Sequence, residues 1–570
     1  MRQAIRKFPR LWRSSRLLRR WYYARYDAYP DWKSILEQNK VLWEATKDAT
    51  KNGPHVLLST AIGSYAHAIT LESSLAVALR LRGVQPHVLL CDAELSACAE
   101  CDASLYPQVN RFVQQGPRQD LCRDCYWPAK RVYEQLGVRV HRLSTLVSNN
   151  QRQVSFSIAQ SIPVDKIREY LHEGLAVGEH AYAGALRFFA TSSLNKDKTT
   201  EGVLRRYFHS ALVTMFATRE LVRKEKFESA VFTHGIYIPW GVMGEVFRHE
   251  GIRVVNWNVA YRKRCFIFSQ GDTYHHTLMS EPQSEWEDLN FRPDQEKRLM
   301  DYLESRRDGL FDWIMFHRPS SPKEPGSLAN SLGLDMTRPI IGLLTNVSWD
   351  AQIHYPANAF SNMLEWLIST CKYFATRSDL QLLIRVHPAE INGFPPSRQP
   401  VLTELRRNLP DLATNIKVVP PESQMSTYGL MSLCNAVIIY GTKMGVELSS
   451  IGLPIIVAGE AWVRNKGLTF DASSPDEYFS ILNRLPFSGP LTVDRRYRAR
   501  KYAYHFFFRR MIPLSFIKPK VGYPIYKLQL NKLKRLLPGA TPGLDVICNG
   551  IVKGSSFTFD EDRLKRVTSR

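Results

Sequence analysis

Short apolar runs alternate with helical stretches along most of this chain. In the first half they are residues 55–59, 86–91, 138–143, 230–233 and 253–257, and in the second half residues 339–345, 380–385, 416–419, 436–440 and 454–458. Runs that are almost continuously apolar are typical of strands buried on both faces, as in parallel sheets covered by helices. The pattern therefore predicts an α/β protein with two doubly wound domains.

A stretch rich in proline, serine and glycine separates the two sets of runs. Residues 319–326 read PSSPKEPG and mark a connection between domains. We expect a first domain over residues 51–325 and a second over residues 335–490. The flanking segments, residues 1–50 and 491–570, are basic and aromatic.

The chain carries 76 Lys and Arg against 54 Asp and Glu, which gives a formal net charge of +22. Such an excess favours anionic partners. Residues 1–30 hold nine Arg and Lys interleaved with aromatic side chains such as Trp12 and Trp21, a pattern that suits an anionic membrane surface. A solvated basic arm is the alternative. No run spans a bilayer and no secretory signal is present, so we expect a cytoplasmic protein, peripheral on the inner face of the cell membrane.

Four cysteines form two CxxC pairs within residues 91–125: Cys98 with Cys101, and Cys122 with Cys125. This spacing matches the two-knuckle zinc pattern, in which four thiolates at about 2.3 Å close the metal's coordination shell. A reducing compartment makes disulfides the weaker explanation. The sequence predicts a structural zinc in an insertion of the first domain, with an iron–sulfur cluster as the alternative.

Polar residues follow several strands of the second domain, where open α/β sheets bind ligands. Arg385 and His387 lie two residues apart, so both point to one side of their strand, and Glu390 follows. Asn346 follows another strand. A cation beside an imidazole predicts a site for a nucleotide phosphate. The alternative is a pair of side chains bonded to local carbonyls.

A third strand end begins at Gly441, which permits a tight turn. Thr442 and the N–H groups behind it predict an anion site at a helix N-terminus. Lys443 and Glu447 are spaced i, i+4, so they can reach one ligand together, with the carboxylate on ribose hydroxyls. The alternative is an ordinary ion pair worth about 0.3–0.5 kcal/mol. Three such strand ends together predict a nucleotide site in this domain.

These residues resemble bacterial capsule-polysaccharide and surface-carbohydrate transferases of the GT-B class, which have two Rossmann-like domains. The resemblance rests on residues 385–390 (RVHPAE), residues 441–443 with Glu447, residues 452–454 and residues 466–469. It implies that His387 binds the nucleotide phosphate and that Glu447 contacts ribose. It also implies a C-terminal segment that packs back on the first domain.

The expected activity is therefore transfer of a sugar from a nucleotide-sugar donor to a glycan or a lipid-linked acceptor, without a catalytic metal. The acceptor hydroxyl needs a base, for which His67 and His234 follow first-domain strands. Asp92 and Glu94 are carboxylate alternatives, and a structural role is the alternative for either histidine.

Other functions stay open. A CDP-alcohol polyol-phosphate transferase uses a similar scaffold, and a nucleotide-sugar 2-epimerase has less need of a membrane-facing arm. A zinc-containing nucleic-acid-binding protein is permitted by the charge and the cysteines. Its basic residues, however, flank the chain ends rather than the cysteine pairs, so no specific nucleic acid is expected. A non-catalytic scaffold is the last alternative.

Overall fold

The computed structural model describes residues 14–15, 17–18, 21–22, 29–271, 273–306, 311–313, 324–350, 357–393 and 395–561. These residues form two compact units. The first comprises the described residues within 1–189, 194–274 and 510–570, and the second those within 190–193 and 275–509. Each unit is an α/β structure with its own sheet.

The first unit has a seven-stranded sheet in the order β13-β6-β5-β4-β1-β2-β3. Its strands are β1 (His55–Ala61), β2 (Gln85–Leu90), β3 (Arg139–Arg142), β4 (Ser229–Thr233), β5 (Arg253–Val259), β6 (Cys265–Gln270) and β13 (Ile512–Pro513). Strands β1 to β5 pair in parallel, whereas β6 pairs antiparallel with β5 and with β13. The strand order runs outward in both directions from β1 and β4, so the connections reverse direction between these two strands.

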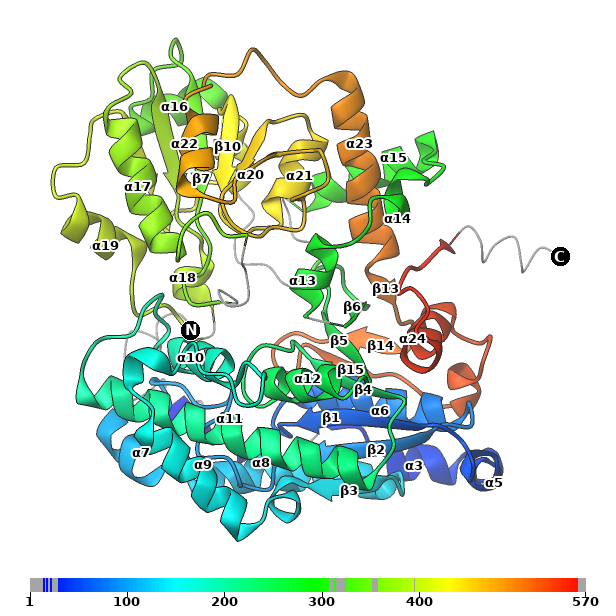
Figure 1. The fold of residues 1–570 in the computed structure, drawn as a ribbon. Helices are drawn as coiled ribbons and strands as arrows, with labels where there is room; N and C mark the ends of the chain where they lie inside the picture. The colour runs from blue at the N-terminus through cyan, green and yellow to red at the C-terminus, as the bar shows by residue number, and fades with distance from the viewer. Residues whose placement is uncertain are drawn as a thin grey trace. The chain divides into compact units, whose positions relative to one another are not determined.

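Helices cover both faces of this sheet (Figure 1). One layer contains α6 (Ala66–Arg80), α8 (Gln119–Gln135) and α24 (Pro542–Lys553), and the other contains α10 (Val177–Phe189), α11 (Lys198–Lys224) and α12 (Trp240–His249). Right-handed crossovers that run in opposite directions along a sheet place their helices on opposite faces. The reversal between β1 and β4 therefore puts α6 and α12 on different faces.

The second unit has a six-stranded parallel sheet in the order β12-β11-β10-β7-β8-β9. Its strands are β7 (Ile340–Leu344), β8 (Gln381–Arg385), β9 (Ile416–Val419), β10 (Ala436–Ile439), β11 (Ile455–Val457) and β12 (Phe470–Asp471). Helix α17 (Met363–Ala375) packs on β8 and β9, and α21 (Met444–Ser450) packs on β11. The order reverses between β7 and β10. Two doubly wound Rossmann-like sheets confirm the predicted α/β class.

The boundary predicted near residue 325 needs correction. The second unit already begins at residue 275, because α14 (Ser284–Glu287) and α15 (Pro293–Ser305) pack on α23 (Val493–Tyr504). The C-terminal segment predicted over residues 491–570 is divided for the same reason. Residues up to 509 belong to the second unit, and residues 510–561 belong to the first.

The basic arm predicted over residues 1–50 also needs correction from residue 29 onward. Three short helices, α3 (Trp32–Glu37), α4 (Lys40–Glu44) and α5 (Thr46–Thr50), belong to the first unit. Trp32 is fully buried and its indole N–H donates to Ser73 Oγ at 2.9 Å. Burial of large apolar side chains outweighs the solvation of the neighbouring charges. Most of residues 1–28, which carry the membrane-surface prediction, lie outside the described residues.

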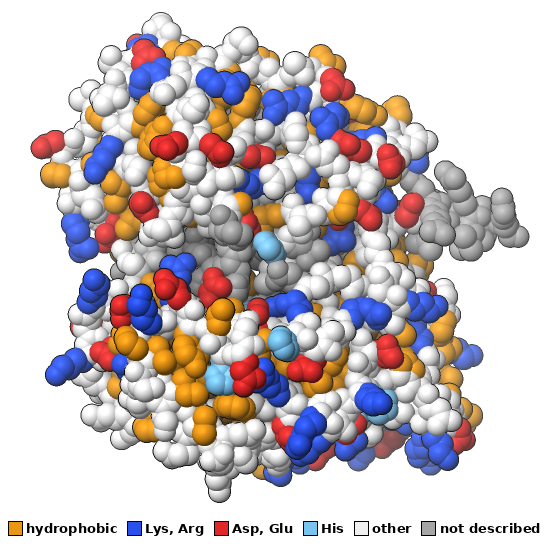
Figure 2. All heavy atoms as spheres, in the orientation of Figure 1, with side chains coloured by type: hydrophobic (Ala, Val, Ile, Leu, Met, Phe, Trp, Pro, Cys, Tyr) orange, Lys and Arg blue, Asp and Glu red, His pale blue; other side chains and the backbone are white. Residues whose placement is uncertain are grey.

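Charge is mixed over one face of the molecule. Figure 2 shows Lys and Arg side chains interspersed with Asp and Glu over the face drawn. The net charge therefore does not by itself mark a binding site on that face. Within the part of the chain that the structure describes, every helix is too short or too polar to cross a membrane.

Candidate functional site

The loops that follow β7 and β10 meet where the strand order of the second unit reverses. The side-chain Nδ2 of Asn346 donates a hydrogen bond to the carbonyl of Gly441. The other side-chain atom, Oδ1, is buried and has no hydrogen-bond partner among the residues that the structure describes. An unsatisfied buried acceptor costs about 1–3 kcal/mol. A ligand donor at this position would recover that free energy.

His387 follows the neighbouring strand β8, and its ring is held in one tautomer. Its backbone N–H donates to Thr345 Oγ1 at 2.9 Å, and its Nδ1 accepts from the backbone N–H of Ala389 at 3.0 Å. Because Nδ1 is an acceptor, the neutral ring carries its proton on Nε2. The half-buried imidazole therefore offers a hydrogen-bond donor at the carboxyl end of the sheet.

Arg385 bonds to local backbone carbonyls, which was the alternative to phosphate binding. Its buried guanidinium donates to the carbonyls of Pro420 and Ser423, the second at 3.2 Å. Burial lowers the pKa of Arg385 to about 10. These bonds occupy the side chain with the loop after β9, so Arg385 positions that loop in the structure.

Glu390 likewise serves the backbone. Its Oε2 accepts from the N–H of Val401 at 2.9 Å, at the first residue of α19 (Val401–Asn408). The carboxyl is buried, and burial raises the pKa of Glu390. A carboxylate at a helix N-terminus is favoured by the helix dipole. The contact explains Glu390 without a ligand.

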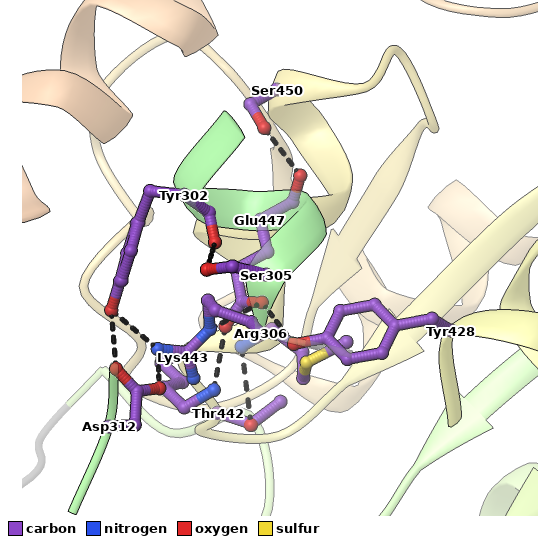
Figure 3. Close-up of polar contacts among 10 residues, drawn as sticks. Tyr302, Ser305, Arg306, Asp312, Tyr428, Thr442, Lys443, Glu447 and Ser450 are labelled. Atoms are coloured by element: carbon purple, nitrogen blue, oxygen red, sulfur yellow. Dashed lines mark hydrogen bonds and ion pairs between the residues drawn. The ribbon is translucent and has the colours of Figure 1, made fainter. Parts of the chain in front are cut away.

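Lys443 and Glu447 form the ion pair predicted as the alternative to ligand binding, with Glu447 buried and Lys443 half-buried (Figure 3). Lys443 Nζ lies 2.6 Å from Glu447 Oε1, and Tyr428 donates its hydroxyl to Oε2 at 2.6 Å. Arg306 Nε donates to the same Oε2 at 3.1 Å. Burial alone would raise the pKa of Glu447, but Arg306 and Lys443 outweigh it and lower that pKa to about 2.

The network continues beyond the predicted pair. Arg306 is paired with Asp312, whose other oxygen accepts from the Tyr302 hydroxyl at 2.7 Å. Arg306 lies 141 residues before Glu447, so no local pattern relates them. Thr442 closes the turn before α21 by accepting from the Met444 N–H at 3.4 Å. Sequence reasoning found the Glu447 pair and missed Arg306, Tyr428 and Asp312.

The reversal between β1 and β4 in the first unit brings two aromatic loops together. Tyr65 follows β1, Trp240 follows β4, and their rings stack with centroids 5.7 Å apart. His67 is the second residue of α6 and is half-buried, with its ring edge-on to Tyr523 and Tyr526. Burial lowers the pKa of His67 to about 4. The imidazole is therefore neutral at pH 7, which is the state that accepts a proton.

His234 lies directly after β4 in a left-handed backbone conformation, with φ +67°. Its ring centroid lies 5.0 Å from that of Tyr237. A left-handed non-glycine residue stores about 1–3 kcal/mol and is often found at functional sites. The two carboxylate alternatives have other roles: Asp92 accepts two hydrogen bonds from Ser144, and Glu94 is paired with Arg152.

The cysteines surround one cavity of about 40 Å³ in the first unit, lined by Cys91, Cys98, Cys101, Cys122 and Cys125. Cys98 and Cys101 lie in the loop after β2, and Cys122 and Cys125 lie in the first turns of α8. Among the described residues, no three cysteine sulfurs lie within 4.8 Å of one another. The predicted zinc thus stays a prediction.

No protein-family model and no curated protein matches the chain. A solved β-Kdo 2,4-transferase, KpsC of Thermosulfurimonas dismutans, is 14% identical with a TM-score of 0.32, over 48% of this chain and 80% of that one. A second KpsC structure from the same organism, a β-Kdo 2,7-transferase, is 13% identical with a TM-score of 0.30, over 56% of this chain and 88% of that one.

A UDP-GlcNAc 2-epimerase from Neisseria meningitidis, solved with UDP-GlcNAc bound, is 10% identical with a TM-score of 0.23, over 79% of this chain and 95% of that one. All three scores lie below 0.5. The fold assignment therefore rests on this chain's own strand order, and the site on its own residues.

Proposed function

We propose that the chain is a glycosyltransferase of the GT-B type that moves a sugar from a nucleotide-activated donor to a surface polysaccharide or lipid-linked glycan. The supporting observation lies at the carboxyl end of the second sheet. His387 offers an Nε2 donor there, and the buried Oδ1 of Asn346 has no partner among the described residues. Ligands of doubly wound sheets bind at such reversal points.

The chemistry follows from these two groups. As the bond between the sugar and the nucleotide breaks, negative charge develops on the leaving phosphate oxygen. A donated hydrogen bond from His387 Nε2 stabilises that charge more in the transition state than in the ground state. Asn346 Oδ1 accepts from a hydroxyl or N–H of the donor. No step in this scheme requires a divalent metal.

The acceptor hydroxyl loses its proton to a histidine of the first unit. His67 and His234 are the candidates, because Asp92 and Glu94 are held by Ser144 and Arg152. The low pKa of His67 keeps its ring unprotonated at pH 7. Attack by the hydroxyl oxygen on the anomeric carbon forms the new glycosidic bond while the nucleotide leaves with the bonding electrons.

We place the enzyme on the inner face of the cell membrane, because residues 1–30 combine nine basic residues with aromatic ones. Co-sedimentation with vesicles that contain anionic phospholipid tests this placement. A chain without residues 1–28 should no longer sediment, whereas equal binding by both chains would exclude the arm as the anchor.

The activity is tested by incubating the protein with nucleoside mono- and diphosphate sugars and following nucleotide release and product mass. His387→Ala should lower kcat by about 10²–10³, the usual cost of losing one such donor, with the fold intact. His249→Ala, at an exposed histidine at the end of α12, is the matched control. Full activity of His387→Ala would refute the assignment. Conversion of the donor sugar to its epimer in the absence of an acceptor would indicate an epimerase instead.

A further inference from the structure

We propose that Cys98, Cys101, Cys122 and Cys125 bind one thiolate-ligated metal centre, and that this centre braces both loops at the strand-order reversal of the first unit. The proposal does not depend on the sugar-transfer activity. It rests on the common cavity of the four cysteines and on what their backbone touches.

The ligand set defines the metal class. Four cysteines from two CxxC pairs line one cavity, together with residues such as Leu105 and Leu121, and their sulfurs would move closer together to share one metal. Four thiolates are the ligands of a closed zinc site and of an iron–sulfur cluster alike. In either case each thiol releases its proton as its sulfur bonds to the metal, with zinc, or iron and sulfide, supplied from outside. Zinc binding changes no oxidation state, and an iron–sulfur cluster would take up its ferric iron already oxidised, so the protein exchanges no electron in either case.

The second pair touches the loop after β1. Cys125 lies on α8, and a Cβ added to Gly63 would overlap the Cys125 carbonyl and the Ala129 side chain. The glycine therefore lets α8 press directly on the turn between β1 and α6. That turn leads within four residues to His67.

The first pair touches the loop after β4. The N–H of Ala99, between Cys98 and Cys101, donates to the carbonyl of Ile238 at 3.0 Å. Arg187 donates to the Ala99 carbonyl and lies over the Tyr237 ring, with its guanidinium carbon 5.4 Å from the centroid. The same loop contains His234.

The cysteine loop is also fixed from α11. The Tyr207 hydroxyl lies 3.1 Å from the Cys98 carbonyl and 3.2 Å from the Cys101 carbonyl. A metal that joins the two CxxC pairs would therefore link α8 and the cysteine loop, and through them both loops that carry the candidate bases. Its role is to position those loops.

A second cluster must be separated from this one. Ligand atoms of His55, His87 and Glu225 lie within 4.8 Å of one another at the amino ends of the strands. Glu225 is already paired with Arg139 at 2.5 Å, and His87 Nδ1 lies 3.0 Å from His141 Nε2. These partners explain the cluster without a metal.

The test is metal analysis of the full chain purified without oxygen, with visible absorption spectra. Zinc with a colourless protein, or iron and sulfide with thiolate-to-iron absorption, would each support the centre and identify it. A double Cys98→Ser, Cys122→Ser variant should lose about tenfold or more of the metal, because two of four ligands are gone. Cys91→Ser, at the fifth cysteine of the same cavity, should keep it.

Bracing is tested by hydrogen exchange after chelation of the wild-type protein, which avoids a variant that fails to fold. Exchange should rise at least several-fold in residues 62–67 and 234–240 and stay unchanged in strand β5. Unchanged exchange in both loops would overturn the bracing role. A protein without metal even after reconstitution with zinc or with iron and sulfide would overturn the centre, as would metal kept by the cysteine variant and lost from His87→Ala.

Discussion

The side-chain amide of Asn346 donates to the carbonyl of Gly441, and this bond joins the loops after β7 and β10 where the strand order reverses. One hydrogen bond thus fixes the orientation of the amide and leaves its oxygen directed away from Gly441.

Replacing Asn346 by Ala should weaken donor binding and lower stability together. The variant removes the Oδ1 acceptor and leaves the Gly441 carbonyl without its donor, at a cost of about 1–3 kcal/mol. We expect a raised KM for the nucleotide sugar and a lower free energy of unfolding in urea. Asn362→Ala is the matched control, since Asn362 caps α17 by accepting from Leu364 and Glu365. It should cost about 1 kcal/mol of stability and leave KM unchanged.

The pKa of Glu447 predicts acid sensitivity of the second unit. The folded pKa of about 2 lies below the ordinary value of 4.5, so the ionised carboxylate stabilises the fold. That contribution is complete above pH 4.5 and is lost as the pH falls toward 2, and it amounts to about 3 kcal/mol. Between pH 6 and pH 3, the free energy of unfolding measured in urea should decrease less for Glu447→Gln than for the wild-type protein. Parallel curves for the two proteins would contradict the assignment.

The left-handed backbone conformation of His234 allows an effect on stability to be distinguished from an effect on catalysis. His234→Gly removes the ring at a position where glycine has no steric penalty, so the variant should unfold at the same or a higher temperature. If His234 is the base, acceptor-dependent transfer should fall by about 10²–10⁴ while slow donor hydrolysis persists. His234→Val, which is strained at this φ, should lower the melting temperature. Full transfer by His234→Gly would assign the base to His67.

Trp32 tests whether the segment after residue 29 belongs to the first unit. Trp32→Ala should lower the free energy of unfolding by about 3–5 kcal/mol, as expected for a fully buried indole. The substitution also leaves Ser73 Oγ without the indole N–H that donates to it. Trp21→Ala, at an exposed tryptophan, is the control and should change the free energy of unfolding little. If Trp32→Ala changed the free energy of unfolding little, residues 29–50 would be a solvated arm and not a part of the first unit.

The fold was predictable from sequence because buried parallel strands have a local signal. Residues 380–385 and 436–440 coincide with β8 and β10 almost residue for residue. The unit boundary was not predictable, because it depends on α15 packing on a helix almost 200 residues later. A segment rich in proline, serine and glycine indicates a loop, but it does not reveal which helices pack together on either side of it.

The site was predictable in position and less so in detail. His387 and Asn346 lie at the carboxyl ends of β8 and β7, as their sequence context indicates. Arg385 lies on the same strand but donates to carbonyls of a loop about 35 residues later. Arg306, one of the partners of Glu447, lies 141 residues earlier in the chain. A spacing rule finds which side chains share a face, whereas their partners depend on tertiary packing.

The first unit is built from both ends of the chain, with the second unit inserted between residues 274 and 510. During synthesis, all strands of the second sheet emerge from the ribosome before β13 exists. The inserted unit can therefore reach its native packing while the edge of β6 still lacks its last partner. The nascent chain would complete the second unit first, and the sheet of the first unit would wait for the segment that begins at residue 510.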